Sequence, residues 1–190
     1  QRNISIDFLG FDGKPYAMIY APHFASAEPA TEQISANDNG KGFEMIKVVI
    51  AAKIKNQINL IRYYAKYKLG KDPDFTEAFE RQTQKMENLR KELKTLANND
   101  KFKGKVFSIE GRAAASYWDM MERMLNDYID FSGRVRQGAT DMVNCMLNYG
   151  YGILYARIWE ALIAAKLNPY ISYLHTTEQE KPALVFDFIE

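Results

Sequence analysis

The sequence predicts a mainly α-helical protein, in which a multi-helix domain follows a short β-hairpin. From Phe43 onward, apolar residues recur every three or four positions over most of the chain, which is the spacing of one helix face. Strand-like alternation of apolar and polar residues is confined to roughly the first 20 residues. Of the 190 residues, 47% are hydrophobic and 13% aromatic, which is enough apolar material for one substantial core.

The hairpin is predicted from two short runs near the N-terminus. Residues 4–8 alternate apolar and polar side chains, and a second run over 17–20 follows the turn residues Asp12-Gly13. Residues 24–41 are rich in Ala, Ser, Asn and Gly and have no sustained period, so they predict a mobile linker. The predicted domains are therefore a hairpin over 1–23, a linker over 24–41 and a helical domain over 42–190.

Two helices are expected in the first half of the helical domain. The first begins near Phe43, carries isoleucines at helical spacing and ends at Gly70. The second is expected to be capped by Asp74 and stopped by Asn98, with a narrow apolar stripe between charged faces.

The second half of the domain is expected to contain two further long helices. One begins near Ser108 and runs to Leu125. A basic loop over 130–140 separates it from a helix spanning 141–166, which is apolar almost all round and is therefore expected at the centre of the bundle. A final apolar run at the C-terminal end is compatible with one more short helix.

Three possible metal ligands lie close together near the C-terminal end of the sequence. If residues 183–190 are helical, the spacing of three between Asp187 and Glu190 places both carboxylates on one face, and His175 lies shortly before them. One imidazole and two carboxylates suit Mn²⁺ or Mg²⁺ better than a structural zinc site, which prefers thiolates. The alternative is that His175 ends a buried segment while the carboxylates are solvated on a surface helix.

Glu110 is a second candidate, with an equally simple alternative. An acidic residue in the first turn of a helix is already explained by the helix dipole. However, Gly111 and Ala113 to Ala115 leave little side-chain bulk around it, which would let a ligand or another element approach closely. Ordinary helix packing uses the same small residues, and both interpretations stay open.

The net charge and the cysteine content exclude few classes of function. With 25 Lys plus Arg against 24 Asp plus Glu, the formal net charge of +1 gives no argument for nucleic acid, so any such affinity must come from local patches. The single cysteine, Cys145, suits a reducing cytoplasm, and no apolar stretch reaches transmembrane length. We expect a soluble cytoplasmic protein without a membrane partner. The sequence has no initiator Met, and we expect it to be a fragment of a longer protein.

Four blocks of the chain, taken in order, form a recognisable pattern. They are SIEGRAAASYW (108–118), DMVNCMLNYGYGILYARIWEAL (141–162), LNPYISYLH (167–175) and LVFDFIE (184–190). Together with IKNQINLIRYY (54–64), they extend over most of the chain, and four ordered blocks are more specific than any single motif. In this pattern the sequence resembles the CRISPR-associated protein one family. The opening hairpin resembles the end of that family's N-terminal β-domain, most of which is absent.

The resemblance implies a function and a site. It implies a metal-dependent DNA endonuclease and integrase of CRISPR adaptation, which inserts spacer DNA into the array by attack of 3′-hydroxyls on phosphodiesters. Glu110, His175 and Asp187 are implied as catalytic residues that bind a divalent metal, Mg²⁺ or Mn²⁺, with Glu190 in or beside the coordination shell. The implied partners are prespacer and array DNA, a second copy in a homodimer, a small companion subunit and, in some relatives, a fused reverse transcriptase.

Basic residues near the predicted site are candidates for contacts to DNA phosphates. These are Arg112, beside Glu110, and Arg134 and Arg136 on the loop, and the alternative interpretation of each is a solvated surface charge. The family usually has consecutive prolines where this loop has residues 137–140, so the loop geometry is expected to differ. Two rival functions stay open: a non-catalytic DNA-binding or assembly subunit of the same complex, and an unrelated helical interaction module.

Overall fold

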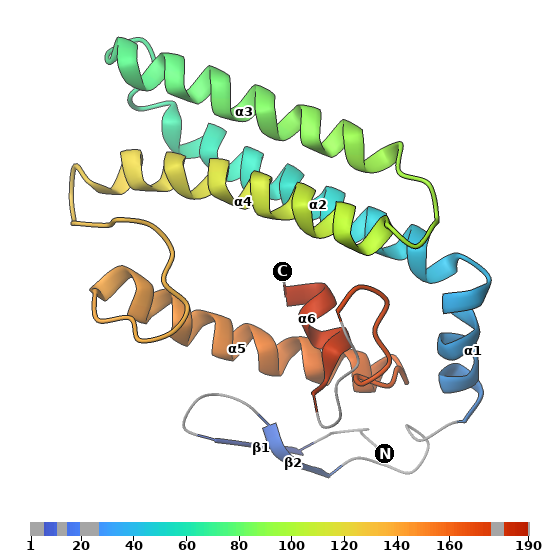
Figure 1. Ribbon diagram of the computed structural model, residues 1–190. Coiled ribbons are helices and arrows are strands. Elements are labelled where there is room, and N and C mark those ends of the chain that lie inside the picture. Colours follow the sequence, from blue (N-terminus) through green and yellow to red (C-terminus); the bar gives the residue numbers. More distant parts are fainter. Residues whose placement is uncertain (1–5, 11–14, 20–26, 176–180, 190) are drawn as a thin grey trace. The chain divides into compact units, whose positions relative to one another are not determined.

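The computed structural model of the chain describes residues 6–10, 15–19, 27–175 and 181–189. Over these residues the secondary structure is one two-stranded hairpin and six helices, which confirms the predicted mainly α-helical fold (Figure 1). The chain divides into two compact units: unit 1 comprises Gln1–Ile46 and Met142–Glu190, and unit 2 comprises Lys47–Asp141. The predicted domain limits at residues 23 and 41 stay predictions. None of the helices in the described ranges combines the length and apolar character needed to span a membrane.

The N-terminal hairpin is confirmed within the described residues. Strand β1 (Ile6–Leu9) pairs antiparallel with strand β2 (Pro15–Ile19), so that Ile6 lies opposite Ile19. The register shifts at the end of β1, between Phe8 and Leu9. Large apolar side chains of both strands are exposed, as expected for a two-stranded sheet that has no buried face of its own.

Helix α1 (Ala27–Asp38) lies where an irregular linker is predicted, so that prediction is wrong over these residues. The helix is tied to unit 1 by the side chain of Gln33, which exchanges two hydrogen bonds with the backbone of Asn168, at 2.6 and 3.2 Å. The hydroxyl of Tyr173 also donates to the carbonyl of Gln33, at 3.3 Å. Tertiary contacts therefore stabilise a helix whose sequence carries almost no amphipathic period.

Helix α2 (Lys41–Ala65) begins close to the predicted start at Phe43. Turns follow Ala65, and Gly70 adopts a φ of 75°, the left-handed conformation that glycine tolerates best. The stripe of isoleucines that predicts this helix is fully buried. Its members are Ile46, Ile50, Ile54, Ile58 and Ile61.

Helix α3 (Pro73–Lys94) has its N-cap two residues earlier than predicted. The carboxylate of Asp72, not that of Asp74, accepts the backbone N–H of Phe75, at 2.9 Å. Pro73 then occupies the first helical position, where its fixed φ is favourable and its missing N–H costs no hydrogen bond. Asp74 lies in the first turn, where a negative charge complements the helix dipole.

Helix α4 (Phe102–Leu125) starts six residues before the predicted Ser108. The carbonyl of Asn99 accepts the N–H of Phe102, at 2.8 Å, and its side chain accepts the N–H of Lys101, at 3.1 Å. The predicted stop of α3 at Asn98 is wrong, because α3 ends at Lys94 with Thr95 as its C-cap, and Asn99 belongs instead to the start of α4. In consequence Glu110 lies in the middle of a helix, and the explanation of its charge by the helix dipole is wrong.

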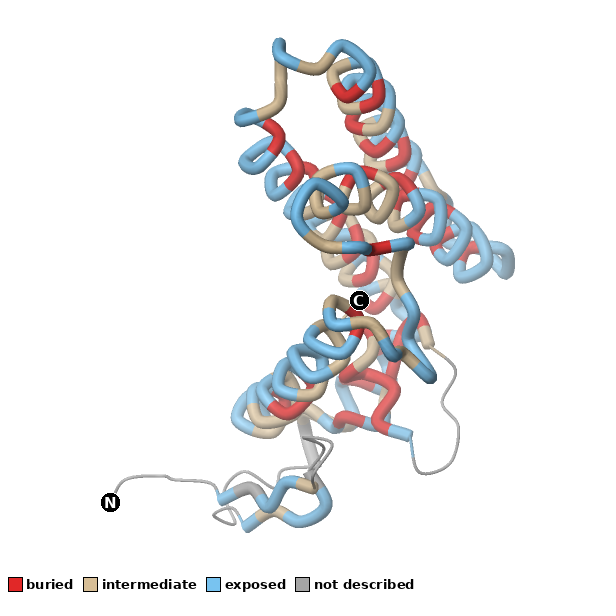
Figure 2. Tube along the Cα trace, turned by 90° about the vertical axis from the view of Figure 1, so that its left-hand side faces the viewer, coloured by how far each residue is buried: buried red, intermediate tan, exposed pale blue. Residues whose placement is uncertain are grey.

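In unit 2, α3 packs directly on α4, and ion pairs tie α2 to both neighbours. Figure 2 shows the buried residues of these helices recurring along each helix, separated by exposed ones. This is the pattern of amphipathic helices that share a core. Fully buried members from α3 and α4 include Met86, Leu93, Val106, Ile109 and Met120.

In unit 1, helix α5 (Met142–Ala164) packs on the short helix α6 (Ala183–Ile189). The rings of Tyr155 and Phe186 are 5.7 Å apart across this contact. The bounds of α5 match the prediction to within two residues, and its expected place at the centre of the bundle stays a prediction. Within unit 1, Tyr155, Ala156 and Leu162 of this helix are buried.

Gly42 allows a close approach inside unit 1, which gives a prediction of stability. A Cβ atom at this position would lie 2.3 Å from Cδ1 of the Tyr173 ring, closer than atoms can pack. We expect Gly42→Ala to lower the free energy of unfolding by about 1–3 kcal/mol, the usual cost of overpacking, although alanine favours helices. Gly150→Ala on α5, where nothing lies within 4 Å, is the control, and we expect it to stabilise by up to about 1 kcal/mol. Chemical unfolding of both variants measures the difference, and a stabilised Gly42→Ala variant would contradict the packing.

Candidate metal centre

His175 and Asp187 lie side by side in unit 1. His175 ends the segment that follows α5, and Asp187 lies on α6, two residues from its end. Nδ1 of His175 is 2.8 Å from Oδ1 of Asp187. An ionised carboxylate only accepts hydrogen bonds, so Nδ1 carries the proton in this contact. The sequence prediction that these two residues converge is therefore correct.

The carboxylate of Asp187 is fully buried, with an exposed fraction of 0%, and both of its oxygens accept hydrogen bonds. Oδ2 accepts the backbone N–H groups of Tyr173 and Leu174, at 2.9 and 3.2 Å. Oδ1 accepts the N–H of His175, at 3.0 Å, in addition to the imidazole. The backbone of residues 173–175 is thus wrapped around this carboxylate.

The hydroxyl of Ser172 completes the shell around Asp187. Its Oγ lies 2.9 Å from Oδ2 and 3.1 Å from Oδ1, and 2.9 Å from the carbonyl oxygen of His175. A hydroxyl has one proton, so Ser172 donates to one of these three acceptors at a time. Ser172 is not among the residues that the sequence singles out, because a serine in an apolar segment carries no signal by itself.

These contacts set the charge state of Asp187. Burial alone raises the pKa of a carboxyl, but hydrogen bonds from His175, from the backbone of Tyr173 and His175, and from Ser172 outweigh it. The net result is that the pKa of Asp187 is lowered. Burial, and then the nearby charge of Asp187, raise the pKa of Tyr173. Asp187 is therefore a buried anion that orders the residues around it, His175 included.

Glu110 belongs to unit 2, where α4 holds it on a buried face with 8% of its surface exposed. Its carboxylate forms an ion pair with the ammonium of Lys53 from α2. Both side chains are mostly buried, so each charge offsets the cost of burying the other. Sequence reasoning missed Lys53, because Lys53 and Lys55 both lie beside Ile54 in the sequence, and nothing in the sequence distinguishes the mostly buried Lys53 from the exposed Lys55.

The structure thus brings together two of the four predicted ligands. Glu110 is described within unit 2, and Glu190 lies outside the described residues. Within each unit taken alone, the described side chains include no group of three His, Cys, Asp or Glu that could hold a metal ion. The shared metal site therefore stays a prediction.

The three predicted phosphate-binding arginines all belong to unit 2. Arg112 on α4 forms an ion pair with Glu92 on α3, at 2.8 Å, and both side chains are about half exposed. Arg134 donates to the carbonyl of its neighbour Val135, at 2.6 Å, and Arg136 is exposed. The loop that carries the last two is irregular, as predicted, with positive φ at its two glycines. Their contact with DNA stays a prediction.

Comparison with known proteins identifies the family. The family model described as CRISPR associated protein Cas1 matches residues 1–190. The chain is 33% identical over 190 residues to the CRISPR-associated endonuclease Cas1 1 of Francisella tularensis subsp. novicida, and the match covers 100% of this chain and 56% of the relative. It is 29% identical over 198 residues to the endonuclease Cas1 1 of Archaeoglobus fulgidus, with 100% and 57% covered. The chain thus spans just over half the length of these relatives.

Solved structures show the same fold. A casposase bound to integration product matches with a TM-score of 0.71 at 24% identity, over 97% of this chain and 52% of the other. A Cas1 protein from Thermotoga maritima matches with a TM-score of 0.72 at 18% identity, over 97% and 55%. A Cas6-RT-Cas1–Cas2 complex matches with a TM-score of 0.73 over 97% of this chain and 19% of that one. The resemblance of the four sequence blocks is confirmed, and the chain belongs to the CRISPR-associated protein Cas1 family.

Proposed function

We propose that the protein containing this chain is a metal-dependent DNA nuclease and integrase of CRISPR adaptation, which inserts spacer DNA into the array. Family membership supports this proposal, as do the names of its relatives, which are called endonucleases or, for one structure, a casposase bound to integration product. The observation that carries it is the His175–Asp187 pair, in which a buried carboxylate fixes the imidazole as it does in metal sites.

The residues proposed to hold the metal are Glu110, His175 and Asp187, with Glu190 in or beside the shell. Carboxylate oxygens and an imidazole nitrogen form a donor set that Mg²⁺ and Mn²⁺ accept. The contact between Nδ1 and Asp187 assigns coordination by His175 to its other ring nitrogen, Nε2. When bound, the ion supplies polarisation of a phosphodiester and stabilises the charge that develops on its oxygens.

Within this set the structure supports a division of roles. Asp187 accepts hydrogen bonds at both oxygens, so orienting His175 is a role that its present geometry already performs. Glu110 forms an ion pair with Lys53 on a mostly buried helix face, so a cation already lies beside its carboxylate. Direct coordination by Asp187 and by Glu190 stays a prediction.

The proposed reaction exchanges one phosphodiester for another. The attacking DNA 3′-hydroxyl loses its proton as its oxygen forms a new bond to phosphorus. The existing bond from phosphorus to the 3′-oxygen of the target strand breaks, and that oxygen takes up a proton, so no proton is gained or lost overall. Because the number of phosphodiesters is unchanged, the step needs no nucleoside triphosphate. If water replaces the 3′-hydroxyl, the same site cleaves DNA.

The proposal includes partners and a location. Arg112, Arg134 and Arg136 would contact phosphates of the prespacer and of the array. A homodimer, a small companion subunit and an associated reverse transcriptase are proposed as partners, and the titles of two structural neighbours name complexes of Cas1 with Cas2 and a reverse transcriptase. The proposed location is the cytoplasm.

The test replaces Glu110 by glutamine in the whole protein. We expect Mn²⁺-dependent cleavage and joining of DNA to fall by about a hundredfold or more, because one charged group that acts on the transition state is lost. DNA binding, measured by fluorescence anisotropy, should be retained. Glu122→Gln on the same helix is the control and should leave all three quantities unchanged.

Two results would contradict the proposal. If the Glu110→Gln variant cleaves and joins DNA at the wild-type rate, Glu110 has no part in the chemistry. If the wild-type protein binds DNA but neither cleaves nor joins it with any divalent metal, the chain belongs to a non-catalytic DNA-binding or assembly subunit.

A further inference from the structure

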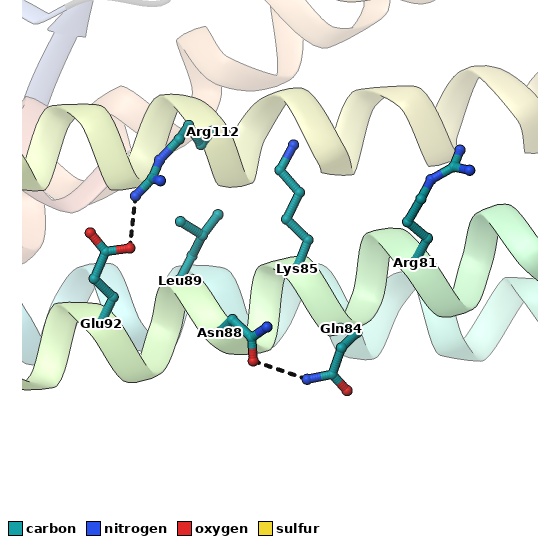
Figure 3. Close-up of a pocket in the computed structure, with 7 residues that line it drawn as sticks. All are labelled: Arg81, Gln84, Lys85, Asn88, Leu89, Glu92 and Arg112. Atoms are coloured by element: carbon teal, nitrogen blue, oxygen red, sulfur yellow. Dashed lines mark hydrogen bonds and ion pairs between the residues drawn. The ribbon is translucent and has the colours of Figure 1, made fainter.

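A surface hollow lies between α3 and α4 in unit 2, away from Glu110's ion pair with Lys53. Its volume is about 430 Å³. Figure 3 shows the side chains around it, six from α3 and one from α4. They are Arg81, Gln84, Lys85, Asn88, Leu89, Glu92 and Arg112.

The hollow is basic although the chain as a whole is nearly neutral. Three of its side chains are cations and one, Glu92, is an anion. Figure 3 shows Arg81 and Lys85 extending toward the side of α3 on which Arg112 lies. Over the described residues, Lys85 has no ion-pair partner, so its charge is not neutralised within the protein.

The two arginines are held only by weak contacts. Arg81 lies 3.6 Å from Glu77, in a pair whose two side chains are well exposed. Arg112 uses one guanidinium nitrogen for Glu92, in a pair that is also about half exposed. Exposed ion pairs of this kind contribute about 0–1 kcal/mol, so an incoming anion can take over these donors at little cost. A guanidinium has five N–H donors, which leaves most of them for a ligand.

The length of the hollow and the separation of its cations match a chain of phosphates better than a single anion. Arg81 and Lys85 are one helical turn apart, and the hollow extends to Glu92, roughly 16 Å along the helix at a rise of 1.5 Å per residue. One DNA strand carries a phosphate about every 3.4 Å along its axis, so this length faces about five phosphates. The other polar side chains of the hollow, Gln84 and Asn88, hydrogen-bond to each other at 3.0 Å (Figure 3).

We propose that the hollow between α3 and α4, with Arg81, Lys85 and Arg112 as its cations, binds the phosphate backbone of duplex DNA without reading its sequence. This inference rests on the proposed function, because it assigns to the DNA a second contact surface besides the metal site. Lys85 and Arg81 position the duplex, and Arg112 joins them by exchanging Glu92 for a phosphate.

The test is the double variant Arg81→Gln/Lys85→Gln in the whole protein, assayed for binding to a short labelled duplex over a range of salt concentrations. Each phosphate contact contributes about 0.9 to the slope of log K against log salt, so we expect the slope to fall by about 1.8. The affinity at low salt should fall roughly tenfold, by a similar factor for duplexes of unrelated sequence.

The matched control is Lys91→Gln/Lys94→Gln, which removes two charges from exposed positions of the same helix outside the hollow. We expect it to change the slope by less than half as much. Circular dichroism should show all variants folded, since each side chain is on the surface. If the hollow variant and the control have equal slopes and affinities, the hollow does not bind DNA.

The outcome is independent of the test of the metal site. Equal binding by both double variants, together with loss of cleavage in Glu110→Gln, would overturn the hollow and leave the proposed function standing. Reduced binding by the hollow variant alone, with cleavage unaffected by Glu110→Gln, would support the hollow and overturn the proposed chemistry.

Discussion

Asp187→Asn is expected to destabilise unit 1 by about 3 kcal/mol, because it leaves buried backbone N–H groups without acceptors. In the wild type both carboxylate oxygens accept, Oδ2 from Tyr173 and Leu174, and Oδ1 from His175. An asparagine has one oxygen and one NH₂ group. In either orientation its NH₂ group faces backbone N–H donors, and among the contacts of Asp187 only the Ser172 hydroxyl, once it donates to the carbonyl of His175, can accept from that group.

The measurement is thermal unfolding in the presence of EDTA, so that no metal contributes. For a chain of this size a loss of about 3 kcal/mol lowers the melting temperature by roughly 6–12 °C. The matched control is Asp130→Asn, at an exposed loop position, which we expect to have no measurable effect. A melting temperature of Asp187→Asn equal to that of the wild type would show that the buried network does not hold this part of the fold.

The pH dependence of the melting temperatures of the wild type and Asp187→Asn tests whether the charge of Asp187 causes the difference in stability. The pKa of Asp187 is lower in the folded protein than its usual value, so its stabilising contribution is complete above the unfolded pKa of about 3.9. This contribution is lost as the pH falls through the folded pKa. We therefore expect the melting temperatures of wild type and Asp187→Asn to converge below about pH 4. A difference that stays constant down to the acid limit would assign the effect to packing instead of charge.

The sequence predicted the parts of the fold that have a strong internal period. The isoleucine stripe of α2 and the apolar run of α5 predict both helices closely, because their pattern depends only on local spacing. Helix α1 was missed because its stability comes from Gln33 and its contacts with Asn168, which is 135 positions away in the sequence. The early start of α4 was missed because the polar residues around Asn99 were interpreted as the end of α3, whereas α3 ends at Lys94 and Asn99 accepts hydrogen bonds at the start of α4.

In the candidate site, too, contacts between residues close in the sequence could be predicted and contacts between distant residues could not. The proximity of His175 and Asp187 is predictable from the sequence, since the two residues are only 12 positions apart. The pair of Lys53 and Glu110 joins residues 57 positions apart on two helices, and only the packing of α2 with α4 reveals it. The hollow between α3 and α4 is likewise invisible in the sequence, because Arg81 and Lys85 resemble ordinary solvated charges on a helix face.

Lys53→Met is expected to produce the second large effect, a loss of stability that should become smaller when metal is added. The methionine removes the ammonium and leaves the mostly buried carboxylate of Glu110 without that cation. Removing one partner of a buried ion pair costs about 3–5 kcal/mol, and the lower end applies here because both side chains retain some exposure. In EDTA we therefore expect a melting temperature well below that of the wild type.

If Glu110 is a metal ligand, a divalent cation should reduce the difference in melting temperature between Lys53→Met and the wild type. In the wild type the ammonium of Lys53 occupies the carboxylate that a metal would bind, so metal binding must displace or repel it. In Lys53→Met that competitor is gone, and the cation relieves the uncompensated charge. Since a ligand that binds the folded state stabilises it in proportion to the logarithm of its concentration over Kd, Mn²⁺ should raise the melting temperature of the variant more than that of the wild type.

The double variant Lys53→Met/Glu110→Gln separates this linkage from a loss of packing. It contains neither charge, so in EDTA it should be more stable than Lys53→Met alone, and the difference measures the cost of leaving the carboxylate of Glu110 without the ammonium of Lys53. Because it lacks the carboxylate of Glu110, Mn²⁺ should raise its melting temperature less than that of Lys53→Met. If Lys53→Met and the double variant respond equally to Mn²⁺, the metal binds elsewhere and Glu110 is only the structural partner of Lys53. If only the single variant responds, the carboxylate on α4 is a metal ligand, because no other group differs between the two proteins.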